Sequence, residues 1–265
     1  MGLYVNKISV KKLYHIENLE IALEDKNHPH LVITGKNGSG KTVLLRAIAD
    51  FLDKVKNDES FQFLKYVAYL ESARKRSANA KTPLARSKIE KELKHWESEV
   101  NKSVCGFTDA EAIIGKYGTG DFVIAFYQAD RKPQMKEPKN PTKPQIKKTA
   151  HITETYSSQF LYFLSDLKIQ EALARNEGKT GDADKIKDWF VSFERVLKRI
   201  FDDNDLELVF NYRDYTFKIT TKEKSFGFNQ MSDGFAAALD IVSDLILKMQ
   251  EGESPTYVYE KTESF

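Results

Sequence analysis

The chain has little of what marks a membrane protein, a disulfide scaffold or a metalloprotein. Its 265 residues include one cysteine, Cys105, which cannot form an internal disulfide and suits a reducing compartment. No stretch approaches the ~18 consecutive apolar residues of a membrane span, and the N-terminus lacks the apolar core of a signal peptide. The five histidines show no metal-ligand spacing. We therefore expect a cytoplasmic protein that makes no membrane contact.

Net charge is also nearly absent. The 41 basic and 39 acidic residues almost cancel, so the balance gives no general indication of a nucleic-acid partner. One local bias stands out between residues 132 and 148, where prolines alternate with lysines and Glu137 is the only acid. That composition predicts an extended, mobile linker over 132–150.

The most informative motif is present near the start of the chain. Residues 35–42 fit G-x-x-x-x-G-K-[ST], the P-loop that cradles phosphate groups. Glycines allow successive backbone N–H groups to converge on phosphate oxygens, and the following helix N-terminus adds a partial positive charge. Lys41 would reach the β- and γ-phosphates, and the Thr42 hydroxyl would bind Mg²⁺. The predicted nucleotide-binding residues are Gly35, Lys36, Asn37, Gly38, Ser39, Gly40, Lys41 and Thr42.

The flanks of this motif fit a P-loop. Residues 31–34 form an apolar, β-branched run that predicts a buried strand, and apolar residues recur at helical spacing from Val43 to Val55. Two alternating segments, 4–10 and 19–23, predict a preceding strand pair with a polar turn between them. The sequence therefore predicts an α/β fold in which a strand, the glycine loop and a helix follow one another.

The rest of the chain divides by composition. Helical spacing with a break near Pro83 predicts a charged antiparallel arm, the apolar run 122–127 predicts a second buried strand, and alternation around Arg213 and Asp214 predicts a hairpin. The predicted divisions are 1–60 for the first strands, P-loop and first helix, 61–115 for the helical insertion, 116–131 for a core strand ending at Gln128, 132–150 for the linker, 151–205 for a helical lobe, 206–250 for the hairpin and a second motif, and 251–265 for a C-terminal tail.

The second motif precedes a strongly apolar helical stretch, 236–249. Met-Ser-Asp-Gly at 231–234 would, in isolation, be a serine N-cap with a glycine in the first turn. Its place in the chain suggests more, because it follows a P-loop, a glutamine at a strand end and a helical lobe. This order resembles ABC-class ATPases, whose signature reads Leu-Ser-x-Gly, in the branch of structural-maintenance-of-chromosomes, RecF and OLD-type ATPases. Met231 replaces the leucine, and Phe235 replaces the usual Gln or Glu after the glycine.

The resemblance implies a P-loop NTPase head with a mixed β-sheet, a helical insertion and a helical signature lobe. In this family ATP and Mg²⁺ lie between two heads paired head to tail, so Ser232 and Gly234 would contact the nucleotide on the P-loop of a second copy. Gln128 would act as a Q-loop residue that touches Mg²⁺ or the attacking water. The implied role is a nucleotide-dependent dimerisation switch of the kind found in prokaryotic DNA repair or antiphage defence.

One part of the family pattern is missing. A complete head needs an apolar strand ending in Asp-Glu, and Tyr257 to Glu260 matches it poorly because Lys261 stands where the catalytic acid belongs. Two explanations remain open: the residues belong to a longer ATPase that carries this acid pair and an effector domain or subunit, or the chain is a degenerate head that binds ATP without hydrolysing it. We favour the first and expect ATP hydrolysis by the complete enzyme, with its catalytic residue unassigned.

Two other classes of function are open. In the first, the chain is a nucleotide-regulated DNA-binding module whose basic stretches, 74–94 and 132–148, contact phosphate backbones. In the second, it is a small-molecule kinase, which would need an arginine-rich lid over the acceptor. Arg131 and Arg213 are too scattered to form such a lid.

Overall fold

A computed structural model describes residues 3–23, 31–56, 59–100, 104–128, 134–140, 142–147, 151–250 and 263–264. The chain is a mixed α/β protein that divides into two compact units, the first formed by 1–124 and 263–265 and the second by 125–262. Among the described residues, no helix combines the length and the apolar character that crossing a bilayer would require.

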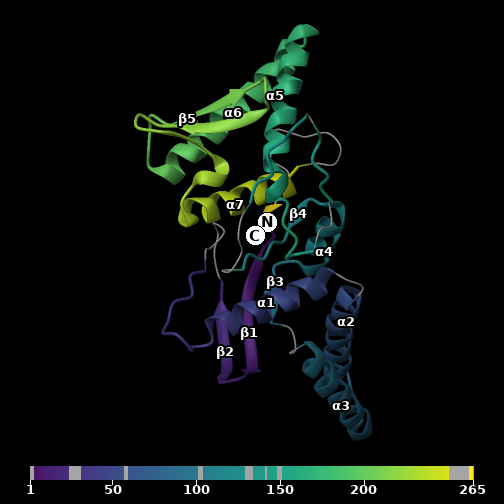
Figure 1. Cartoon of the computed structure of the whole chain (residues 1–265). Helices are drawn as coiled ribbons and strands as arrows, with labels where there is room; N and C mark the ends of the chain where they lie inside the picture. Colours follow the sequence, from purple (N-terminus) through teal and green to yellow (C-terminus); the bar gives the residue numbers. More distant parts are fainter. Residues whose placement is uncertain are drawn as a thin grey trace. The chain divides into compact units, whose positions relative to one another are not determined.

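The first unit is built on a three-stranded antiparallel sheet with the order β2-β1-β3 (Figure 1). Strands β1 (Val5–Leu13) and β2 (Ile16–Ala22) form a hairpin in which Leu13 pairs with Ile16, so the turn is Tyr14 and His15. The predicted strand pair is thus confirmed, with a tighter and earlier turn. Strand β3 (Cys105–Phe107) pairs with the other edge of β1.

Helix α1 (Lys41–Lys56) covers this sheet, as the helical spacing after the glycine loop predicts. Leu44 is buried in one cluster with Val5, Ile8 and Val10 of β1, and Phe51 stacks on Phe107 with ring centroids 6.2 Å apart. The helix that begins at the P-loop is therefore fixed by its apolar face, which leaves its N-terminal end open to solvent.

The predicted charged arm is confirmed as an antiparallel helical hairpin. Helix α2 (Glu59–Ala78) turns at residues 79–82 into α3 (Pro83–Val100), which begins at the proline predicted to break the helix (Figure 1). Trp96 of α3 packs on Tyr66 and Tyr69 of α2, with ring centroids 5.6 and 4.9 Å away. Helix α4 (Ala110–Thr119) and strand β4 (Phe122–Val123) complete the unit, and β4 pairs in parallel with β8 (Glu263–Ser264).

Two predicted strands differ from the structure. Residues 31–34 are not a strand, and the Val32 side chain is 79% exposed. An apolar run becomes a strand only where a neighbouring backbone satisfies its N–H and C=O groups, and no described strand pairs with this one. The predicted strand at 122–127 is limited to β4; residues 122–124 are buried, as predicted, but the chain then leaves the sheet and Phe126 N–H donates to the Ile152 carbonyl.

The second unit packs helices on an antiparallel sheet. Helices α5 (Phe160–Asn176) and α6 (Thr180–Phe201), joined by residues 177–179, pack together in the predicted helical lobe. The predicted hairpin is confirmed as β5 (Glu207–Asn211) and β6 (Thr216–Thr220). A third strand, β7 (Ser225–Gly227), was not predicted. Short 3-10 turns lie at Ser157–Gln159 and Phe228–Gln230, and helix α7 (Asp233–Lys248) follows the second. The core includes Phe160, Leu164, Leu167, Trp189, Phe193, Leu197, Ile219 and Leu239.

The Pro/Lys-rich segment lacks regular structure, as predicted, but it is anchored rather than mobile where it is described. The Asn229 side chain accepts from Met135 N–H (3.0 Å) and donates to the Met135 carbonyl (2.8 Å). Gln159 brackets Gln145 in the same way, at 2.8 and 3.2 Å. A side-chain amide can replace a strand partner because it offers one donor and one acceptor at peptide-like spacing. Met135 is also buried in the core.

Candidate functional site

Residues 35–40 of the P-loop motif form a turn immediately before α1, and Lys41 and Thr42 are the first two residues of that helix. Gly35, Gly38 and Gly40 have φ values of +155°, +81° and +89°, which L side chains rarely adopt. A Cβ on Gly40 would lie 2.8 Å from Ile16 Cδ1 and 3.0 Å from His15 Nε2, because the β1–β2 turn packs against the loop. The positive φ values therefore favour glycine at 35 and 40, whereas the contacts at Gly40 involve side-chain ends that can shift.

Lys41 turns back over this loop. Its Nζ donates to the carbonyl of Gly35 at 2.6 Å and to that of Lys36 at 2.8 Å. The ammonium group is thus held against the loop backbone by two contacts that depend on the positive-φ path of the chain. A cation in this position favours an anion bound in the same loop.

The remaining features of the loop also favour an anion. Helix α1 has no acidic residue in its first turn, so its positive end is not neutralised by its own side chains. Lys36, Asn37, Gly38 and Ser39 are exposed, and so is Thr42 in the first helical turn. Nothing lies within 4 Å of the position of a Cβ on Gly38, which leaves space for a ligand close to the backbone.

The second motif lies at the N-terminus of α7. Ser232 is the N-cap residue with extended backbone angles (φ −66°, ψ 155°), yet its side chain makes no capping hydrogen bond. The predicted serine cap is thus present by position, but the hydroxyl is not used by the helix backbone. Ser232, Asp233 and Gly234 are exposed, and a Cβ on Gly234 would meet nothing within 4 Å. The motif presents a hydroxyl and helix N–H groups to solvent.

The chain on both sides of this motif is held firmly. Gln230 Oε1 accepts from Gly227 N–H at 2.8 Å, which fixes the turn that leads into the helix. After the motif, the Phe235 ring stacks on Phe201 with ring centroids 4.5 Å apart and ring planes 21° from parallel. Phe235 remains 38% exposed, so an aromatic face borders Ser232 and Gly234.

Sequence analysis missed a buried polar cluster further along α7. Asp244 is fully buried and accepts from the Tyr127 hydroxyl (2.6 Å) and from Tyr156 N–H (2.5 Å). Lys248 Nζ lies 2.9 Å from Asp244 Oδ2 as an ion pair, although its geometry is not that of a hydrogen bond. The sequence could have indicated this cluster, because Asp240, Asp244 and Lys248 follow one another at intervals of four residues in a largely apolar helix and so share one helix face.

Gln128 follows Tyr127 directly and is exposed in the second unit. Its neighbour Tyr127 is fixed to α7 through Asp244. The structure brings residues 35–42 together in the first unit, and brings Ser232 and Gly234 together in the second. Residues 257–260, with Glu260, lie outside the described residues.

Among the described residues, no three His, Cys, Asp or Glu side chains are grouped closely enough to hold a metal ion. The predicted Mg²⁺ ligands, Thr42 and Gln128, carry a hydroxyl and an amide, so they do not belong to these four residue types. A magnesium ion held by Thr42 would take its other ligands from phosphate oxygens and water, as is usual for this ion.

Cys105 is predicted to be chemically inert. Its side chain is 2% exposed in β3, and burial raises the pKa of the thiol to about 12, so the thiolate is scarce near neutral pH. We expect iodoacetamide at pH 8 to leave the native protein unlabelled and to label it fully after denaturation, as read by intact mass. Native labelling at the rate of free cysteine would contradict this burial.

Comparison with known proteins gave no match to any protein-family model, any curated protein or any solved structure.

Proposed function

We propose that the chain binds ATP with Mg²⁺ at residues 35–42 and acts as a nucleotide-dependent dimerisation switch, as an ABC-type P-loop ATPase head does. Gly35 to Gly40 would hold the phosphates with backbone N–H groups, Lys41 would neutralise the β- and γ-phosphates, and Thr42 would bind the metal. Bound nucleotide would supply negative charge beside the Lys41 ammonium.

The observation that carries this proposal is the position of the Lys41 ammonium. Two backbone carbonyls at 2.6 and 2.8 Å hold it over a loop of positive-φ glycines. The same lysine would exchange these neutral acceptors for phosphate oxygens, which are stronger because they are charged.

The second half of the proposal concerns pairing. Ser232 has an exposed hydroxyl without a capping bond, at the start of a 16-residue helix whose positive end faces solvent. Such a terminus suits the γ-phosphate of a nucleotide carried by another copy. We therefore propose a head-to-tail homodimer in which Ser232 and Gly234 of one copy close over the P-loop nucleotide of the other.

The proposed context is DNA maintenance or antiphage defence in the cytoplasm, with the chain as part of a longer ATPase. Hydrolysis would belong to the complete enzyme, whose catalytic acid we do not assign to any residue of this chain. An effector domain or subunit would use the nucleotide state of the pair, and Gln128, next to the Tyr127–Asp244 contact, would report that state to α7.

Replacing Ser232 by arginine tests the pairing. We expect S232R to bind Mg–ATP with wild-type affinity but to remain monomeric at ATP concentrations that pair the wild type, because a bulky cation would fill the space for the partner's loop. The measurements are calorimetry for binding and sedimentation velocity with and without Mg–ATP for pairing. The matched control is S192R, which adds the same side chain at an exposed position of α6.

The S192R control separates a specific loss of pairing from a general effect of adding an arginine to the surface. S192R should bind and pair like the wild type. Equal loss of nucleotide affinity in S232R and K41A would contradict pairing in trans, and normal ATP-dependent pairing of S232R would show that α7 does not face the partner.

A further inference from the structure

The α2/α3 hairpin ends in a tip of one charge sign. Residues 72–89 include the last turns of α2, the connecting turn and the first turns of α3, and they contain no Asp or Glu. The stem is the rest of the hairpin, residues 59–71 of α2 and 90–100 of α3. There, by contrast, acidic and basic residues are interspersed from Glu90 to Glu99. The basic residues of the tip are Arg74, Lys75, Arg76, Lys81, Arg86 and Lys88. In a chain whose total charge nearly cancels, this tip is a local concentration of positive charge.

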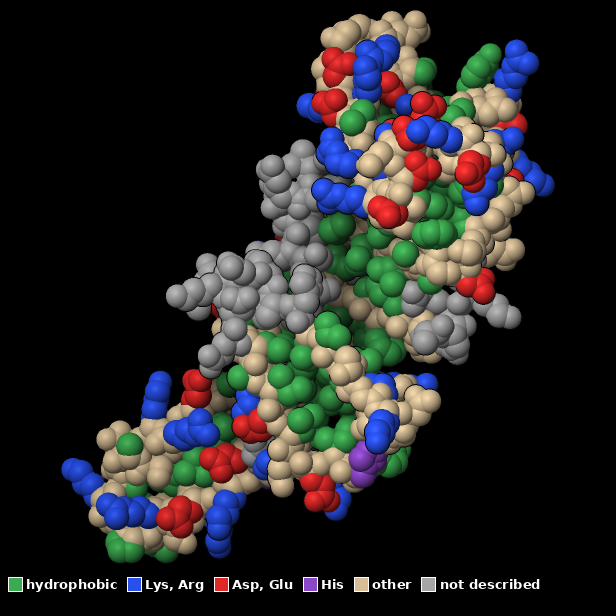
Figure 2. Space-filling view, turned by 90° about the vertical axis from the view of Figure 1, so that its left-hand side faces the viewer, with side chains coloured by type: hydrophobic (Ala, Val, Ile, Leu, Met, Phe, Trp, Pro, Cys, Tyr) green, Lys and Arg blue, Asp and Glu red, His purple; other side chains and the backbone are tan. Residues whose placement is uncertain are grey.

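Only part of this charge is compensated by the stem. Arg76 pairs with Glu92 at 2.7 Å, and Arg74 lies 3.5 Å from Glu97. Both glutamates lie on α3, and no carboxylate pairs with Lys75, Lys81 or Lys88 among the ion pairs of the described residues. These three lysines are exposed. Lys and Arg side chains project from the end of the hairpin at the bottom of Figure 2.

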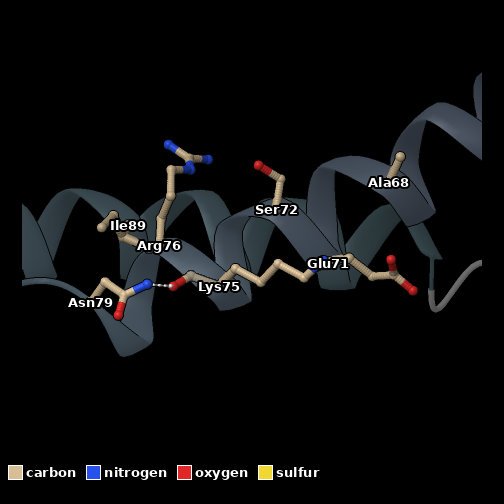
Figure 3. Close-up of a pocket in the computed structure, with 7 residues that line it drawn as sticks. All are labelled: Ala68, Glu71, Ser72, Lys75, Arg76, Asn79 and Ile89. Atoms are coloured by element: carbon tan, nitrogen blue, oxygen red, sulfur yellow. Dashed lines mark hydrogen bonds between the residues drawn. The ribbon is translucent and has the colours of Figure 1, made fainter.

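Two of the cationic side chains border a shallow, open groove. An open cavity of about 650 Å³ runs along α2 and is lined by Ala68, Glu71, Ser72, Lys75, Arg76, Asn79 and Ile89. Figure 3 shows Arg76 and Ser72 directed to one side of α2, with Lys75 extended along the helix. Asn79 Nδ2 donates to the Lys75 carbonyl at 3.1 Å, which ties the end of α2. The groove therefore combines cations with a hydroxyl and an amide group, with the Glu71 carboxylate towards the stem of the hairpin.

The backbone of α3 adds to the positive electrostatic potential at the tip. Helix α3 begins at Pro83 without an acidic residue in its first turn, and Thr82 Oγ1 accepts from Ala85 N–H at 3.3 Å. Arg86 Nε donates to the Ala80 carbonyl at 3.1 Å, which holds the turn closed. The positive end of an 18-residue helix is thus placed among the tip lysines.

We infer that this tip binds the sugar–phosphate backbone of a DNA duplex. Helix ends, lysines, arginines and hydroxyl groups are the donors that proteins direct at duplex phosphates, and such contacts need no base recognition. A membrane surface fits less well, because an interfacial helix needs a broad apolar face and Leu84 is the only large apolar side chain of the tip that is strongly exposed, at 72%. The inference does not depend on nucleotide binding at residues 35–42.

The test neutralises the tip and compares it with the stem. K75Q/K81Q/K88Q removes three exposed tip lysines, and K65Q/K91Q/K94Q removes three exposed lysines from the stem of the same hairpin. Binding of the full chain to a fluorescent DNA duplex is measured by anisotropy from 50 to 200 mM NaCl without nucleotide. We expect wild-type binding to weaken steeply with salt, because each phosphate contact adds about −0.9 to the slope of log K against log salt.

The tip variant should bind at least about tenfold more weakly at 50 mM salt and lose about three from the magnitude of that slope, while the stem variant keeps wild-type values. K41A should bind the duplex like the wild type, which separates this inference from the nucleotide site. Absence of duplex binding, equal loss in both triple variants, or no loss in the tip variant would overturn it. Binding to anionic vesicles but not to the duplex, lost in the tip variant, would assign the tip to membranes instead.

Discussion

Replacing Lys41 by alanine is expected to weaken Mg–ATP binding about 10- to 100-fold, the effect of losing a hydrogen bond between charged groups worth about 1.5–3 kcal/mol. The Lys41 ammonium is the only side-chain cation that the structure holds over the described P-loop backbone. Its loss also removes two contacts to the loop, so the loop of the variant would bind phosphate with N–H groups alone. Calorimetry with Mg–ATP gives the affinity.

The matched control is K36A. Lys36 lies in the same loop and is exposed, but its carbonyl, not its side chain, accepts from Lys41. We expect K36A to keep most of the affinity and K41A to lose it, with unchanged circular dichroism in both. Equal affinities of K41A and the wild type would show that Lys41 does not meet phosphate.

Replacing Asp244 by alanine is expected to lower the free energy of unfolding by about 3–5 kcal/mol. The Asp244 side chain has 0% exposure, accepts hydrogen bonds from the Tyr127 hydroxyl and the Tyr156 N–H, and forms an ion pair with the Lys248 ammonium. Its removal leaves a cation, which is 6% exposed, buried without a counter-ion. Urea unfolding followed by fluorescence of the two tryptophans measures the loss.

D182A is the control for this variant. Asp182 also pairs with a lysine, Lys185, at 3.4 Å, but both side chains are largely exposed, and surface pairs contribute about 0–1 kcal/mol. The double variant D244A/K248M should recover part of the stability because it removes the uncompensated charge. Loss in D244A no larger than in D182A would mean that the buried pair does not stabilise the second unit.

Local patterns predicted the parts of the fold that depend on neighbouring residues. Pro83 predicted the break in the helical arm because proline cannot continue a helix but can begin one, and α3 begins there. Alternation on both sides of Arg213 and Asp214 predicted the β5–β6 hairpin. The helix after the glycine loop also followed from spacing alone.

The parts that sequence could not predict depend on contacts between distant residues. The anchoring of Met135 relies on Asn229, 94 residues later, and the environment of Asp244 relies on Tyr127, 117 residues earlier. The run 31–34 has strand composition, but composition does not say whether a partner strand pairs with it. The prolines and lysines of 132–148 predicted a mobile linker. That composition does not reveal that the side-chain amides of Asn229 and Gln159 bind the segment at Met135 and Gln145.

Titration of the intact wild-type chain with Mg–ATP, and in parallel with a non-hydrolysable ATP analogue, tests nucleotide binding most directly. Saturable one-site binding of both ligands, weakened in K41A and retained in K36A, is the expected result. No heat and no protection of residues 35–42 in hydrogen exchange at millimolar nucleotide would contradict the proposed site.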